Sequence, residues 1–218
     1  MEMAQSTPAL RDLFTILFKP RETMRRILDA RDRWTIQIVV LACICSETDD
    51  VDPRAAGQLL PYLKFLSIAA IAVLVITAIA ISWVVILVVL SWLATFTGHL
   101  LGGTGTLRDV RAALSWATVP IIWSVIYRVP FAIYKSQVDL RNVHLRDVLF
   151  NFVAQGGCAL IVVVLGLQVI FFVWSIFIGT HTLAEAQRFS TEKGFVNLAI
   201  TLAFPVLVIA GAIISFRK

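Results

Sequence analysis

Three long segments without a charged residue constrain this chain more than any other feature. They run from Phe65 to Gly98, from Val148 to Thr180 and from Gly194 to Phe216. A helix needs ~20 apolar residues to cross a bilayer core of ~30 Å. Hydrophobic residues make up 59% of the 218 residues and charged residues 15%, whereas a soluble domain is roughly 45–50% apolar. The sequence therefore predicts an all-α polytopic membrane protein.

The other candidate spans are shorter or interrupted. Trp34–Ser46 is uncharged over 13 residues, which gives only ~20 Å of helix. A first span there either extends back through Met24–Leu28 or crosses a thinned region of the bilayer. A third span is expected after Arg111, kinked or shortened by Pro120 and Pro130. With these two, the sequence predicts a bundle of five transmembrane helices.

Residues 1–33 are predicted to form a cytoplasmic, interfacial segment ahead of a membrane domain at 34–216. Within Thr7–Phe18, apolar residues recur at spacings of three and four, which is typical of an amphipathic helix; they are Leu10, Leu13, Phe14 and Leu17. This helix either lies on the membrane surface or packs against the spans. Pro20 predicts the start of a second helix, because proline is favoured in a first turn.

The second predicted span is longer than a bilayer requires, and the end of the fourth must be located. Phe65–Gly98 would measure ~50 Å as one helix, and no Gly or Pro interrupts it before Gly98. We expect one long helix that is tilted or projects into the cytoplasm. The fourth span is expected to end near Thr180, because Thr182–Glu185 has the pattern of a capping box that starts a new helix.

A glycine-rich turn from Gly98 to Pro120 joins the second and third predicted spans. It holds four glycines in eight residues, followed by an amphipathic run. It lacks the strand and lysine of a phosphate-binding loop, although its amides together with Arg108 and Arg111 could hold a phosphate. Anionic lipid headgroups are the expected ligands of Arg108 and Arg111, and of Arg25 and Arg26 ahead of the first span.

A metal site is one hypothesis for the same side of the membrane. His181 and Glu185 are four residues apart and would share a helical face, and His99 ends the second predicted span. Two imidazoles and a carboxylate could bind zinc or another divalent cation. The alternative is that interfacial histidines cap helix ends. The acidic stretch Glu47–Arg54 is interpreted as a solvated loop, because it lacks EF-hand spacing. No cofactor and no catalytic residue is predicted.

Charge sets the expected orientation and partners. Seven of the 19 Lys and Arg residues precede Trp34, and an acidic loop follows the first predicted span. Basic residues favour the cytoplasmic side, so we expect the N-terminus in the cytoplasm and the C-terminus outside. The net charge of +5 fits anionic headgroups and does not indicate nucleic acid. The expected partners are membrane lipids, a membrane protein or a second copy of the chain.

Two blocks of residues resemble a known family. One is Pro20-Arg-Glu-Thr-Met24, and the other is Leu101-Gly-Gly-Thr-Gly-Thr-Leu107 followed by Ala112-Ala-Leu-Ser-Trp-Ala-Thr-Val-Pro120. Together with the five-span layout they resemble the Yip family, whose members interact with Ypt/Rab GTPases. The chain is similar to the short prokaryotic-type members, which implies a bacterial or archaeal cytoplasmic membrane. A Rab partner is not carried over, because the long cytosolic region of eukaryotic members has no counterpart ahead of the first span.

Three functions remain open from the sequence. The first is a non-enzymatic, Yip-like protein that organises membrane or assists a membrane partner. The second is a transporter or binder of a lipid or lipid-linked small molecule, since the second, fourth and fifth spans lack the charges that ion-coupled transport needs and a neutral lipid needs none. The third is metal binding. A cavity lined by the third and fifth spans would favour the lipid, and a filled bundle would favour a partner role.

Overall fold

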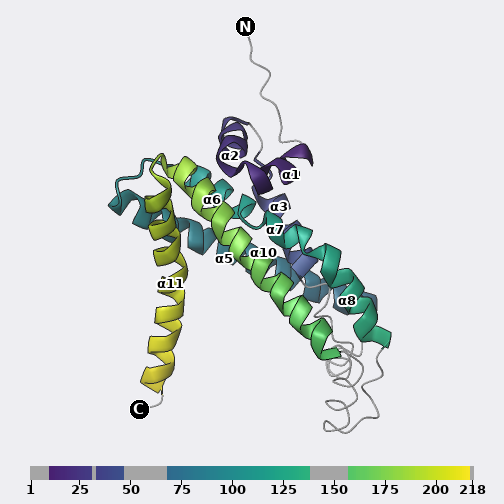
Figure 1. Cartoon of the computed structure of the whole chain (residues 1–218). Coiled ribbons are helices and arrows are strands. Elements are labelled where there is room, and N and C mark those ends of the chain that lie inside the picture. Colours follow the sequence, from purple (N-terminus) through teal and green to yellow (C-terminus); the bar gives the residue numbers. More distant parts are fainter. Residues whose placement is uncertain (1–9, 31–32, 47–67, 138–156, 217–218) are drawn as a thin grey trace.

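The structure is a computed structural model that describes residues 10–30, 33–46, 68–137 and 157–216. Every secondary-structure element in these ranges is an α-helix, which confirms the predicted all-α class there (Figure 1). In chain order they are α1 (Leu10–Phe18), α2 (Pro20–Asp29), α3 (Thr35–Ser46), α5 (Ile68–Leu100), α6 (Leu107–Trp116), α7 (Val119–Trp123), α8 (Val125–Gln137), α10 (Gly157–Gln187) and α11 (Thr191–Phe216). The acidic stretch Glu47–Arg54 lies outside the described residues.

The two longest helices are α5 and α10. α5 is uninterrupted over 33 residues, as predicted. α10 runs without a break for 31 residues, so the prediction that a new helix starts at Thr182 is wrong. The Thr182 hydroxyl does not cap a helix, because it donates to the Ala113 carbonyl oxygen at 3.1 Å and to that of Gly179 at 3.3 Å. The fourth span therefore continues past Thr180 to Gln187.

The third predicted span is broken, as its prolines predict. Pro120 occupies the first turn of α7, and Pro130 lies inside α8. The segment 107–123 and the helix that follows it differ in direction by 43°. Pro120 is compatible with a helix start because its ring replaces an amide that has no intrahelical acceptor there.

Among the described residues, two helices are long and apolar enough to cross a membrane. They are Val73–Leu100 within α5 and Val162–Gln187 within α10, and the bent segment 107–132 makes a third if it is one span. α3 is apolar but shorter. The structure thus supports two or three spans by length and composition, and the count of five stays a prediction.

The helical segments alternate in direction between two ends of the bundle. Arg33, just before α3, pairs with Asp109 at the start of α6, and Ser46 at the end of α3 accepts a hydrogen bond from Arg128 of α8. α5 and α10 both end at the turn that precedes α6, and α11 leads away from this end, so that α10 and α11 meet there and diverge (Figure 1). We call the end that contains Asp109 and the C-terminal end of α10 the head.

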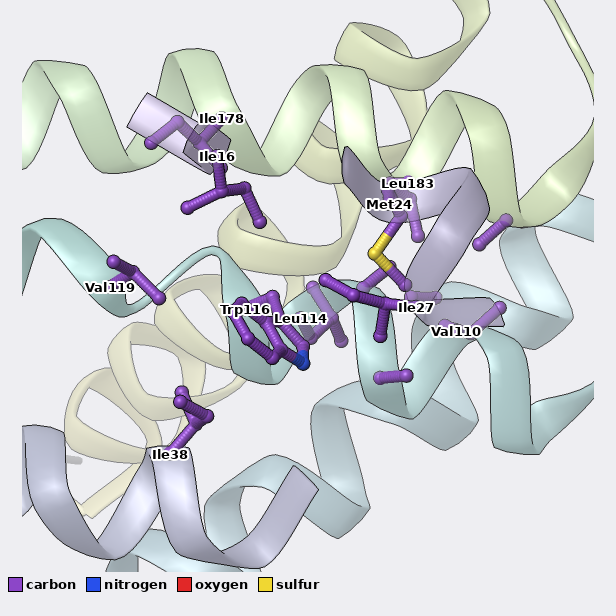
Figure 2. Close-up of a cluster of buried hydrophobic side chains, with 14 of the residues drawn as sticks. Ile16, Met24, Ile27, Ile38, Val110, Leu114, Trp116, Val119, Ile178 and Leu183 are labelled. Atoms are coloured by element: carbon purple, nitrogen blue, oxygen red, sulfur yellow. The ribbon is translucent and has the colours of Figure 1, made fainter. Parts of the chain in front are cut away.

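The apolar core lies at the head. Trp116 is fully buried in a cluster drawn from α1, α2, α3, α5, α6, α7, α10 and α11, part of which Figure 2 shows. The Trp116 indole N–H donates to the Arg33 carbonyl oxygen at 2.9 Å, which satisfies the polar atom of a buried aromatic residue. Away from the head, every side chain of α5 from Val73 to Ala78 is exposed, as expected of a lipid-facing surface.

Candidate functional site

The glycine-rich turn, residues 98–106, is folded against the end of α10. A Cβ added at Gly98 would lie 2.2 Å from Gln187 Nε2, and one at Gly105 would lie 2.3 Å from the Ala186 carbonyl oxygen. Gly102 has a φ of +87°, which L residues rarely adopt. The glycines therefore allow two backbones to approach more closely than side chains would permit. We call residues 98–106 the glycine corner.

Gln187 is the polar centre of this contact, and it is fully buried. Its Nε2 donates to the Ala94 carbonyl oxygen at 3.2 Å, and its Oε1 accepts from the Gly105 amide at 3.3 Å. Its own carbonyl oxygen accepts from the Thr104 amide at 3.1 Å. Asn197 of α11 also donates to the Ala94 oxygen, at 3.1 Å. One buried side chain thus connects α5, the glycine corner and α10, with α11 joined through Asn197.

The amides of the glycine corner donate hydrogen bonds to acceptors within the protein. Gly102 and Gly103 donate to carbonyl oxygens of His99 and Gly98, and Thr104 donates to Gln187. The amides of Gly105 and Thr106 donate to the side chains of Gln187 and Asp109. The hypothesis that these amides hold a phosphate is therefore wrong, because each already has an acceptor.

The structure does not bring the three predicted metal ligands together. His99 Nε2 lies 3.1 Å from the Gly105 carbonyl oxygen, and His181 Nδ1 lies 2.9 Å from the Phe177 carbonyl oxygen of its own helix. Glu185 pairs with arginine instead. Within the ranges that the structure describes, no group of three or more His, Cys, Asp or Glu side chains could hold a metal ion.

Two of the four arginines predicted to bind headgroups also connect the N-terminal helices to the bundle. Arg25 Nε donates to Glu185 Oε1 at 2.8 Å, and Arg26 lies 3.2 Å from Asp12 of α1. The hydrogen bond and charge of Glu185 raise the pKa of Arg25 above its ordinary value. The Arg25 side chain remains 71% exposed, so its role at headgroups stays a prediction.

The other two predicted headgroup residues lie on α6. Arg108 is exposed and Arg111 is half-buried. Both lie within a turn of Asp109, at the head, where the charged surface of the bundle begins. Their contact with anionic lipid stays a prediction.

Asp109 joins α6 to the N-terminal segment. Its carboxylate accepts from the Thr106 amide and its amide donates to the Thr106 hydroxyl, which completes a capping box. The same carboxylate lies 2.6 Å from Arg33 Nη1, and both side chains are mostly buried, with exposed fractions of 20% and 13%. Asp109 therefore completes the hydrogen bonds of the cap at the start of α6. It also neutralises an arginine that has little contact with water.

We expect Asp109→Ala to lower the free energy of unfolding by about 2 kcal/mol, because it removes half of a capping box and leaves Arg33 without its carboxylate. Unfolding in mixed micelles titrated with SDS measures this. Glu22→Ala is the matched control, since its pair with Lys19 is 65–70% exposed and should contribute less than about 1 kcal/mol. Equal losses in the two variants would contradict the assignment.

An apolar cavity of about 390 Å³ lies between the helices, next to the head. Its walls come from α3, α5, the bent segment of α6 to α8, α10 and α11. Leu114 and Ile121 line it from the third predicted span, and Leu198 and Leu202 line it from the fifth. The bundle is thus hollow at the position where the sequence analysis placed a possible groove.

The cavity opens toward the outer surface of the bundle. Ile86, Phe172 and Leu202 line it, and they are 56%, 62% and 41% exposed. The hydroxyls of Ser46, Thr118 and Ser124 donate to carbonyl oxygens of their own helical segments, and most of the lining side chains are apolar. Among the described lining residues Arg128 is the only charged one, and its Nη1 donates to the Ser46 carbonyl oxygen at 2.6 Å.

Sequence reasoning missed Gln187, Arg128 and the ion pairs of Glu185. The density of glycines gave a signal that something approaches the corner closely, but nothing identified Gln187 as the partner. Arg128 lies in the third predicted span, and no pattern in the sequence indicated its contact with the end of α3. The pairing of Arg25 with Glu185 joins residues 160 positions apart, which no local pattern reveals.

Comparison with known proteins supports the resemblance found in the two sequence blocks. The family model described as the Yip1 domain matches residues 14–213. A search of curated proteins and a search of solved structures returned no significant match. The matched range covers nearly the whole chain, from α1 to near the end of α11, and the chain therefore belongs to the Yip1-domain family of membrane proteins.

Proposed function

We propose that this protein is a non-enzymatic integral membrane protein that binds a membrane lipid, with an acyl chain in the cavity between α3, α5, the bent segment, α10 and α11. The observation that carries the proposal is the apolar cavity that opens on the outer surface of the bundle. A volume of about 390 Å³ falls within the roughly 300–1,000 Å³ typical of ligand sites. Acyl chains are the apolar molecules that this outer surface meets in a membrane.

The chemistry of the wall supports binding rather than catalysis. The described lining residues include no His, Cys, Asp, Glu or Lys, so within them no general base stands ready to activate a hydroxyl. Arg128 adds one positive charge to a wall that is otherwise uncharged in the described residues. The protein then presents the bound lipid to a membrane partner or moves it along the bundle. Both functions need the same binding site.

The proposal includes the five-span arrangement in a cytoplasmic membrane of prokaryotic type. The alternating directions of the helices support a head on the cytoplasmic side and a C-terminus outside. The exposed arginines of the head, among them Arg25 and Arg108, favour the cytoplasmic side, where basic residues are enriched. Contact of Arg25, Arg26, Arg108 and Arg111 with anionic headgroups belongs to this proposal, as does a second copy or a membrane protein as partner.

Photolabelling of the full chain in vesicles tests the lipid site. A phospholipid with a diazirine near the middle of one acyl chain should label Leu87 and Leu114, which line the cavity and are only 6% and 9% exposed. Lipid that stays outside the bundle does not reach these side chains, whereas it labels Val173 on the outer face of α10, which is 56% exposed. Mass spectrometry of the labelled peptides distinguishes lipid in the cavity from lipid outside the bundle.

We expect Leu202→Trp to remove most labelling of Leu114, because overpacking an occupied cavity costs about 1–3 kcal/mol, which is about 5- to 150-fold in occupancy. Ile200→Trp is the control, since Ile200 is 42% exposed on the same helix and is not among the lining residues. Ser175→Phe fills the cavity from α10 and gives an independent test. Labelling of Leu114 that is absent in the native protein, or equal in all variants, would refute the lipid site.

A further inference from the structure

α1 carries an apolar stripe that the described residues leave more than half exposed. Leu10, Phe14 and Phe18 are spaced by four residues, which places them along one face of the helix. Their exposed fractions are 70%, 54% and 76%. The opposite face contains Ile16 and Asp12, both buried against the bundle. A row of large exposed apolar side chains opposite a buried face marks contact with a partner or a membrane.

Two indole groups fix α1 with this stripe facing outward. Trp123 of α7 donates to the Leu13 carbonyl oxygen, and Trp174 of α10 donates to the Leu17 carbonyl oxygen, each at 3.2 Å. The Leu17 oxygen belongs to the last turn of α1, where carbonyl oxygens have no intrahelical donor. The Phe14 ring also packs on the Trp123 ring at a centroid distance of 4.4 Å. α1 is thus held across α7 and α10 in a defined orientation.

The level of Trp174 separates two kinds of surface. On the side of Trp174 away from the head, α10 exposes apolar side chains such as Val169 and Val173. Toward the head, Phe177 is the last large exposed apolar side chain of α10, and charged side chains begin with Glu185. Tryptophan is enriched at the boundary between the hydrocarbon and the headgroups, so the Trp174 level has the composition of a membrane interface.

The cationic side chains at the two ends of α1 are also suited to a membrane interface. Arg11 and Lys19 are both exposed. A helix whose apolar face inserts while cations flank it is attracted to anionic lipid. The charge of α1 and its stripe therefore favour a lipid leaflet over an apolar protein surface, which would have to cover the cations as well.

We propose that α1 lies in the cytoplasmic leaflet with Leu10, Phe14 and Phe18 inserted at the boundary of headgroups and acyl chains, so that the membrane interface passes through Trp123 and Trp174. The head, including the glycine corner and Gln187, then stands outside the hydrocarbon. This placement accounts for the length of α5, whose 33 residues measure ~50 Å against a core of ~30 Å. It is independent of the lipid cavity, which needs no insertion of α1.

Depth-dependent quenching tests the placement in the full chain. Phe14→Cys carries an environment-sensitive fluorophore, in a background without the three native cysteines, in vesicles of phosphatidylcholine and phosphatidylglycerol. A blue-shifted emission is expected, quenched more strongly by a nitroxide at acyl carbon 5 than at carbon 12, and protected from aqueous iodide. Glu22→Cys is the matched control on the exposed surface of α2, and it should be quenched by iodide and by neither nitroxide.

Two results would overturn the inference. Iodide quenching of the Phe14 probe as strong as that of the Glu22 probe would place α1 in water. Protection from both iodide and the nitroxides would mean that protein, either a second copy or a partner, covers the stripe. Phe18→Cys reports the same face if the Phe14 variant fails to fold. Neither result bears on photolabelling of Leu114, so this inference and the lipid site fail separately.

Discussion

Gly105→Ala is expected to prevent the head from folding or to lower the free energy of unfolding by about 3 kcal/mol or more, because the new methyl group has no space. Its Cβ would lie 2.3 Å from the Ala186 carbonyl oxygen and 3.1 Å from the Gln187 Cα. Both obstacles are backbone atoms, so no side-chain rotation relieves the overlap. α10 would have to move away from the corner, which breaks the hydrogen bonds of Gln187.

Gly166→Ala is the matched control for this prediction. Gly166 lies in the same protein, inside α10, and an added Cβ would meet nothing within 4 Å. Alanine is favoured over glycine in a helix by up to about 1 kcal/mol, so this variant should be neutral or slightly more stable. The midpoint of SDS unfolding in mixed micelles measures both. A Gly105→Ala protein as stable as Gly166→Ala would show that the close contact at the corner is absent.

Gln187→Leu should cost about 3 kcal/mol of unfolding free energy, because leucine has nearly the same volume but satisfies none of the polar groups around it. The Gly105 amide would lose its acceptor in a buried site. The Ala94 carbonyl oxygen would lose the donor from Gln187 and keep those from Asn197 and Thr97. A buried amide without a partner costs about 1–3 kcal/mol, and the loosened contact of α5 with α10 adds to it.

Gln168→Leu provides the control in the same helix. Gln168 is exposed and lines the open side of the cavity, so a change to leucine there removes no buried hydrogen bond and should cost little unfolding free energy. Unfolding in SDS titration compares the two variants under the same conditions. If both variants were equally stable, the buried network around Gln187 would have no part in holding the head together.

The glycine corner shows how far sequence reasoning reaches. Four glycines in eight residues predicted a tight turn after a long helix, and the structure has that turn between α5 and α6. The same composition could not specify what approaches the turn, because the partner, Gln187, is 82 residues beyond Gly105. The phosphate hypothesis was the alternative, and it fails because Gln187 and neighbouring residues already satisfy the amides.

The end of α10 was mispredicted for a related reason. Thr182 and Glu185 have the spacing of a capping box, and a helix start was expected there. In the fold, Thr182 donates to the Ala113 carbonyl oxygen and Glu185 pairs with Arg25. Both side chains serve tertiary contacts, and a local motif cannot distinguish these from a cap. The helix start at Pro20 and the break in the third span near Pro120 depend on local geometry alone, and both were predicted correctly.

The candidate cavity was only partly foreseeable. The third and fifth predicted spans were named as the walls of a lipid cavity, and Leu114 and Leu202 of these spans do line a common cavity. The contributions of α3 and α5 follow from packing and have no signature in the sequence. The metal hypothesis joined His99, His181 and Glu185 by their expected side of the membrane, which is a weaker constraint than distance.

A structure of the protein in lipid nanodiscs, determined by electron cryomicroscopy, tests the central claim most directly. We predict elongated density of an acyl chain between Leu114 and Leu202, continuous with the lipid around the bundle and lost in Leu202→Trp. Helices that close on each other, with side chains filling the space next to Leu114 and no density of lipid, would contradict the account.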